Sequence, residues 1–216
     1  MKKLLFVFMI FAILLVLSAC SNTTSNNDTS AELQQTEAAN SATDKEAENQ
    51  NSEQEPTETG SKSLVVYFSW SGNTRSVAES IASRTNSDIF EIVPAEPYSD
   101  DYDTVVDLAQ EEQKNNVRPE IVGSIDDIEQ YDVVYVGYPN WWGDMPMVLY
   151  TFFDTYDLSG KTVAPFCTSG GSELSNTVNE IKELEPNATV TEGLHIGSGS
   201  ASNPDNAVNE WLAEIA

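Results

Sequence analysis

Short apolar runs alternate with amphipathic stretches from residue 62 to the end of the chain. The apolar runs predict five strands, over Leu64–Ser69, Asp88–Pro94, Asp132–Tyr138, Thr162–Thr168 and Val190–Ile196. The amphipathic stretches predict five helices, over Thr74–Thr85, Asp103–Asn116, Pro146–Tyr156, Leu174–Leu184 and Pro204–Ile215. The pattern therefore predicts strands and helices in strict alternation.

Strands that alternate with helices are typical of a parallel sheet with helices on both faces. We expect the α/β class, with a doubly wound five-stranded parallel sheet in one compact domain over residues 62–216. In such sheets a ligand binds at the carboxyl ends of the strands, beside the point where the strand order reverses. The loops after the first, third and fourth predicted strands are therefore the candidate binding loops.

The N-terminus has the pattern of an export signal. Lys2 and Lys3 precede an apolar run from Leu4 to Leu17, which is short for a membrane span and typical of a signal peptide. The run ends in Leu-Ser-Ala-Cys20, which resembles the lipobox of bacterial lipoproteins. We predict a signal peptide over residues 1–19 and lipidation of Cys20, which would hold the protein on the extracytoplasmic face of the cell membrane. An uncleaved anchor would place the domain in the same compartment.

Residues 20–61 are mostly Ser, Thr, Asn, Gln, Glu, Asp and Ala, without an aromatic residue. Such a segment cannot bury enough apolar surface to offset the entropy lost on ordering. We expect a disordered acidic and polar linker between the membrane and the domain.

The chain is strongly acidic, with a formal net charge of −25. Residues 62–216 carry 7 basic and 26 acidic side chains, so the predicted domain is itself near −19. This charge argues against a nucleic-acid partner. It suits docking with a basic protein, and it equally suits simple solubility.

The loop after the first predicted strand combines small polar residues with a helix start: Ser69, Trp70, Ser71, Gly72, Asn73 and Thr74. Backbone N–H groups at a helix start are unpaired and lie at the positive end of the helix dipole, so they bind anions. Gly72 lets the backbone close round a ligand, and hydroxyls add donors. The loop lacks the lysine of a nucleoside triphosphatase P-loop. It could also be an ordinary helix cap.

Two further loops carry unusual residues. The third predicted strand leads into Pro139, Asn140, Trp141, Trp142 and Gly143. One or both tryptophans could stack on a flat heterocycle, while one could instead fill a gap under the following helix. The fourth predicted strand leads into Thr168, Ser169, Gly170 and Gly171, whose small side chains leave N–H groups accessible. Tyr98 and Tyr102 are weaker candidates to flank a ring.

Together these three loops resemble those of flavodoxins, particularly the short bacterial branch with a Trp-Trp-Gly loop. The resemblance covers about residues 61–216 and implies strand order 2-1-3-4-5 with non-covalently bound FMN. It assigns Ser69, Ser71, Gly72, Asn73 and Thr74 to the phosphate. It assigns Pro139, Asn140, Trp141, Trp142 and Gly143 to the isoalloxazine ring, with Thr168, Ser169, Gly170 and Gly171 closing the site. Because most flavodoxins are not exported, the resemblance does not identify a redox partner, which could be a protein or a small molecule.

We expect an electron-transfer protein with no catalytic residue of its own and no metal site. An acidic, aromatic pocket disfavours the anionic reduced flavin and so makes it a stronger reductant. The alternatives are an FMN-dependent NAD(P)H reductase of quinones or other small acceptors, and a lipoprotein that binds a different phosphorylated ligand. Cys167 and His195 are expected to be structural, because neither has a partner nearby in sequence for thiol or metal chemistry.

Overall fold

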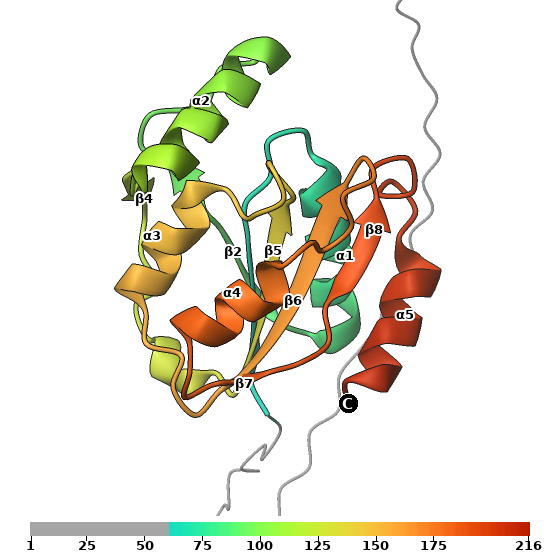
Figure 1. The fold of residues 1–216 in the computed structure, drawn as a ribbon. Coiled ribbons are helices and arrows are strands. Elements are labelled where there is room, and N and C mark those ends of the chain that lie inside the picture. Colours follow the sequence, from blue (N-terminus) through green and yellow to red (C-terminus); the bar gives the residue numbers. More distant parts are fainter. Residues whose placement is uncertain (1–60) are drawn as a thin grey trace, which may run out of the picture. The chain divides into compact units, whose positions relative to one another are not determined.

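The computed structural model describes residues 61–216 (Figure 1). The predicted signal peptide, the lipidated Cys20 and the predicted linker up to residue 60 lie outside the described residues. Within residues 61–216, no helix is long and apolar enough to cross a membrane.

The main sheet has six strands in the order β2-β1-β5-β6-β7, and β8 pairs with β6 beyond the end of β7. Its strands are β1 (Ser63–Tyr67), β2 (Asp88–Glu91), β5 (Val133–Pro139), β6 (Thr162–Ser169), β7 (Thr189–Val190) and β8 (Leu194–Gly197). All pairings in this sheet are parallel. Because β7 and β8 together take the place of the fifth predicted strand, the predicted order 2-1-3-4-5 is confirmed.

Five α-helices cover the sheet (Figure 1): α1 (Asn73–Thr85), α2 (Tyr102–Asn115), α3 (Met147–Thr155), α4 (Thr177–Leu184) and α5 (Asp205–Glu214). Alternate residues of β1 face opposite sides, as the pleat requires. Val65 packs with residues of α1 and α5, whereas Val66 packs with residues of α3 and α4. Both faces are therefore buried, which explains why the strands are almost wholly apolar.

Two predicted strands are interrupted. The predicted strand Asp88–Pro94 divides into β2 and β3 (Val93–Pro94), because the chain leaves the main sheet after Ile92 and β3 pairs with β4 (Ile121–Val122), which was not predicted. A 3-10 turn over Ile128–Gln130 was also missed.

The last predicted strand contains a bulge. Val190 pairs with Val163, but Leu194 pairs with Phe166, so the chain between β7 and β8 has one residue more than β6 between these pairs. Thr191-Glu192-Gly193 accommodates the extra residue, and the carbonyl of Glu192 accepts a hydrogen bond from Trp211 Nε1 at 2.9 Å. A bulge at a sheet edge of this kind leaves no periodicity signal in the sequence.

Candidate functional site

Helix α1 begins directly after the loop that follows β1, with Gly72 as its N-cap at φ 87°. Among residues 61–216, no side chain accepts a hydrogen bond from the first helical N–H groups. A Cβ on Gly72 would meet no atom within 4 Å, so no distant part of the chain covers this residue. Unpaired N–H groups and the helix dipole make this position suitable for an anion.

The hydroxyls of this loop lie at different depths. Ser71 is exposed, and Ser69 Oγ accepts a hydrogen bond from the Gly72 N–H at 3.1 Å. Thr74 is fully buried, and its Oγ1 lies 2.9 Å from Oγ1 of Thr168, in β6. This hydrogen bond ties the first loop to the end of β6. Contact between Thr74 and an anion therefore stays a prediction.

The first turn of α1 offers neutral donors. Asn73 is its half-buried first residue. The guanidinium of Arg75 pairs with Glu91 at 2.5 Å and donates to the hydroxyl of Tyr67 at 3.3 Å. Because this positive charge already has partners, an anion at the start of α1 would be held mainly by N–H and O–H groups.

A tight turn follows β5. The N–H of Trp141 donates to the carbonyl of Asp144 at 2.9 Å, and the Asp144 N–H donates back at 3.0 Å. The two central residues have positive φ, 56° at Trp142 and 82° at Gly143, which is a type I′ turn. Gly143 adopts this conformation without strain, whereas Trp142 does so at a cost of roughly 1–2 kcal/mol. Strain of this kind is often found at binding sites.

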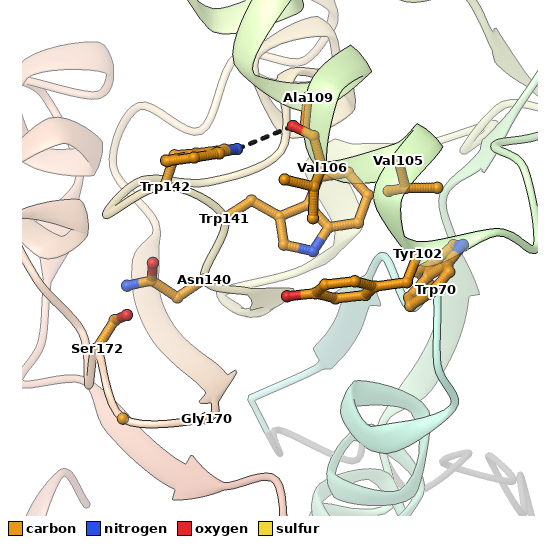
Figure 2. A pocket seen from close by; sticks show the side chains of 11 residues that line it. Trp70, Tyr102, Val105, Val106, Ala109, Asn140, Trp141, Trp142, Gly170 and Ser172 are labelled. Carbon is orange, nitrogen blue, oxygen red and sulfur yellow. Dashed lines mark hydrogen bonds between the residues drawn. The ribbon is translucent and has the colours of Figure 1, made fainter.

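The two adjacent tryptophans both extend toward α2 but have different surroundings (Figure 2). Trp141 packs edge-on against Phe68 and Tyr98, with ring centroids 5.5 and 5.2 Å away. Trp141 is half-buried and packs against the main core cluster, as expected of one of the pair, and it also lines the cavity described below. Trp142 is 54% exposed, and its Nε1 donates to the carbonyl of Val106 in α2 at 3.0 Å.

Asn140 joins the turn to the loop after β6. Its Nδ2 donates to the carbonyl of Glu173 and to Ser175 Oγ, each at 2.9 Å. Its Oδ1 accepts from the Gly143 N–H at 3.0 Å, and its own N–H donates to the Thr168 carbonyl at 2.9 Å. Pro139, the last residue of β5, places Asn140 at this junction.

The loop after β6 is fixed by the single histidine of the chain. Ser169 is buried, and its Oγ lies 2.9 Å from Nε2 of His195 in β8. The same Oγ accepts a hydrogen bond from the Gly171 N–H at 3.4 Å. His195 is thus a satisfied structural residue, as predicted. Cys167 is also buried, and burial raises the pKa of its thiol to about 12, so it is not a reactive thiolate.

These loops and helix α2 surround a cavity of about 560 Å³ (Figure 2). It is lined by Trp70, Tyr102, Val105, Val106, Ala109, Asn140, Trp141, Trp142, Gly170, Gly171 and Ser172. Trp70 is held in place by its Nε1, which donates to the Ser99 carbonyl at 2.9 Å. Six of the lining residues were predicted to bind the cofactor. The other nine predicted residues do not line it: Ser69, Ser71, Gly72, Asn73, Thr74, Pro139, Gly143, Thr168 and Ser169.

Sequence reasoning missed one wall of this cavity. We call Tyr102, Val105, Val106 and Ala109 the α2 wall. These residues are spaced i, i+3, i+4 and i+7, which normally indicates a helix face packed on the core. Tyr102 was a weaker candidate and does line the cavity, whereas Tyr98 does not line it and donates to Glu112 at 2.8 Å. The sequence showed this apolar stripe on α2, but it did not show that the stripe faces a cavity.

No residue that lines the cavity is charged. The carboxylate of the turn, Asp144, accepts hydrogen bonds from the Tyr150 hydroxyl at 3.0 Å and from the Met145 N–H at 2.7 Å. Burial raises the pKa of Asp144 despite these donors. The site therefore combines an open anion position with an uncharged, aromatic cavity.

The chain is similar to several flavoproteins of known structure. A proposed flavoprotein from Bacteroides eggerthii is 35% identical with a TM-score of 0.65, over 72% of this chain and 98% of that protein. A flavoprotein from Lactobacillus acidophilus, solved in complex with FMN, is 29% identical with a TM-score of 0.59, over 71% and 99%. Among curated proteins, none matches this chain significantly.

The flavodoxin family model matches residues 62–215, which is nearly the whole of the described domain. The match includes each of the three loops that meet at the cavity. This chain therefore belongs to the flavodoxin family.

Proposed function

We propose that this protein binds FMN at the carboxyl edge of its sheet and transfers electrons at the outer face of a cell membrane. The observation that carries the proposal is the open start of α1 beside an uncharged cavity lined by aromatic residues. The first suits a phosphate and the second a flat ring. The FMN complex of the Lactobacillus acidophilus relative supports the same ligand.

The chain's own residues would bind the cofactor and exclude water. The N–H groups at the start of α1, with Ser69, Ser71 and Asn73, would hold the phosphate. Trp70, the Trp-Trp-Gly turn and the Thr168–Gly171 loop would surround the ring. When bound, FMN supplies the electron-carrying chemistry. The uncharged lining and the domain charge near −19 disfavour added negative charge, so we expect a low reduction potential.

An absorption spectrum of the purified full chain, with and without added FMN, tests this proposal. Binding in an aromatic cavity should shift the flavin bands from those of free FMN and quench tryptophan fluorescence. Unshifted flavin bands together with unquenched protein fluorescence would refute FMN binding.

Lipid anchoring is the second part of the proposal. It rests on the Leu-Ser-Ala-Cys20 sequence after an apolar run. Cys20→Ala should move the protein from the membrane fraction to the soluble fraction and abolish labelling by palmitate. Cys167→Ala is the matched control, because Cys167 lies buried in β6 and should leave both readouts unchanged. Equal membrane association of the two variants would contradict lipidation.

The electron partner would be a redox protein, which the acidic surface favours if that protein is basic, or a small-molecule acceptor. An FMN-dependent NAD(P)H reductase of quinones or other small acceptors is the rival function, and the same cavity would serve it. The lining contains no lysine or arginine for the phosphates of a nicotinamide dinucleotide, which favours the carrier. Rapid oxidation of NADH or NADPH by the FMN-loaded protein would establish the rival instead.

A further inference from the structure

Helix α2 differs from the other four helices in what its apolar side faces. Among residues 61–216, no residue of α2 belongs to either of the two core clusters, whereas α1, α3, α4 and α5 each contribute buried apolar residues to them. The two buried apolar residues of α2, Val105 and Ala109, line the cavity instead. Helices in proteins gain most of their stability from an apolar face packed on other elements. For that packing, α2 therefore depends on whatever fills the cavity.

The segment that carries α2 leaves the main sheet and returns to it through a narrow neck. At this neck β3 and β4 pair antiparallel, and the Ala95 N–H donates to the Glu120 carbonyl at 2.8 Å. Figure 1 shows α2 beside α3 at the edge of the domain. Because its two ends are joined, the segment over residues 95–120 can move as one unit without disturbing the main sheet. We call this segment the α2 strap.

Two hydrogen bonds join α2 to the Trp-Trp-Gly turn on the other side of the cavity. Trp142 Nε1 donates to the Val106 carbonyl at 3.0 Å, and Gln113 Nε2 donates to the Trp141 carbonyl at 2.7 Å. When such a bond breaks, both groups can bond to water instead, so its net contribution to stability is small. The helix is thus held across the cavity by bonds that open easily.

The contacts near the neck are of a different kind. The strap residues closest to the neck are anchored by an aromatic pair, an ion pair and a hydrogen bond: Tyr98 with Phe68, Arg118 with Asp154, and Pro119 with Thr151. These contacts lie on both chain ends of the strap and hold its base against the domain. The strap is therefore fixed at the neck and only lightly held over the cavity, which is the arrangement of a hinged cover.

We propose that the α2 strap opens transiently about its neck in the FMN-free protein, and that FMN closes it by supplying the apolar surface on which Val105 and Ala109 pack. A ligand that binds the closed form better than the open form shifts the population toward the closed form. This inference rests on the proposed function, because it assigns the cavity to FMN. It concerns the order of α2 rather than the position of the ligand.

The test is hydrogen exchange of the full chain with and without FMN, comparing the central amides of α2 with those of α1. The two helices are of similar length, 14 and 13 residues, and the apolar residues at the centre of α1 are fully buried in the core. Without FMN, the amides of residues 105–109 should exchange at least about a hundredfold faster than those of residues 77–81, because local opening exposes them. Saturating FMN should slow the exchange of residues 105–109 by at least about tenfold.

A variant in one of the two bonds tests the hinge. Gln113→Leu removes the bond to the Trp141 carbonyl and should speed the exchange of residues 105–109 in the FMN-free protein by about fivefold. Gln130→Leu is the matched control, because Gln130 Nε2 also donates to a backbone carbonyl at 2.7 Å, that of Asp127, outside the strap. Thermal unfolding shows whether each variant is folded. If Gln113→Leu is not, Trp142→Phe takes its place, since it removes the other bond.

Three results would overturn the inference: residues 105–109 exchange as slowly as residues 77–81 without FMN, bound FMN leaves their exchange unchanged, or the variant in the bond exchanges like the control. Unshifted flavin bands in the sample with FMN would instead refute the proposed function. The comparison of α2 with α1 in the FMN-free protein tests the opening of the strap in either case.

Discussion

The start of α1 and the α2 wall are the two halves of the candidate site, and they are built differently. At the start of α1 the backbone makes the site, through Gly72 at φ 87° and N–H groups left unpaired by the helix itself. The α2 wall is made of side chains from a helix distant in sequence from the Trp-Trp-Gly turn to which it is bound. Local geometry determines the first half, and tertiary contacts determine the second.

This difference predicts how each half responds to substitution. A backbone site should fail when its dihedral angles are disturbed, and it should tolerate loss of nearby side chains. A side-chain wall should fail when its packing or its hydrogen bonds are removed. The following variants test that contrast, in order of decreasing effect.

Trp141→Ala should reduce the free energy of unfolding by about 2–3 kcal/mol, less than for a fully buried aromatic residue, because Trp141 is half-buried. Trp142→Ala should change it by less than about 1 kcal/mol, because the exposed ring contributes one hydrogen bond and alanine keeps the same left-handed backbone. Urea unfolding without FMN measures both. Trp142→Ala should nevertheless weaken FMN binding or raise the potential of bound FMN, and no change in either would show that Trp142 does not touch the ring.

Gly72→Val should lower FMN affinity by about a hundredfold, because a β-branched residue resists the left-handed conformation at φ 87° and disturbs the N–H groups behind it. Gly160→Val is the control, since Gly160 has φ 79° with equally open surroundings in the turn before β6. Both variants should lose similar stability, but only Gly72→Val should lose FMN, as measured by fluorescence titration. Equal affinities would place the phosphate elsewhere.

Asp144→Asn should stabilise the protein at pH 7. Burial raises the folded-state pKa of Asp144, so the stability linked to this group is greatest below its unfolded pKa and is lost as pH rises through the folded value. The amide keeps the acceptor for Tyr150 and Met145 without the buried charge. The gain should disappear at acidic pH, where Asp144 is protonated in both states. If the variant were more stable by the same amount at every pH, the added stability would come from packing and not from removal of the charge.

His195→Asn should weaken FMN binding by two- to fivefold, because it removes the partner that orients Ser169. His195→Gln should restore binding, since its amide reaches the position of the imidazole Nε2 and the shorter side chain does not. In a Ser169→Ala background the two histidine variants should bind FMN equally. If they still differed there, His195 would act through another contact.

Much of the fold could be read from the sequence, because each element carries its own periodicity. Strands such as β1 and β6 are short apolar runs bounded by polar loops, so they could be predicted from the sequence. The order of the strands in the sheet was implied by the family resemblance. The bulge between β7 and β8 and the pairing of β3 with β4 could not be read, because both depend on residues distant in sequence. The same reason explains the missed α2 wall.

The amino-acid sequence alone determined the parallel sheet, the candidate binding loops at its carboxyl edge and the glycine at the start of α1, since periodicity and backbone conformation are local properties. Only the tertiary structure decided that Trp141 is half-buried against other aromatic rings while Trp142 is exposed, and that one stripe of α2 faces a cavity. Both outcomes depend on which side chains from distant parts of the sequence pack against these residues. A pattern along the chain shows that a residue is apolar, but not whether protein or ligand will cover it.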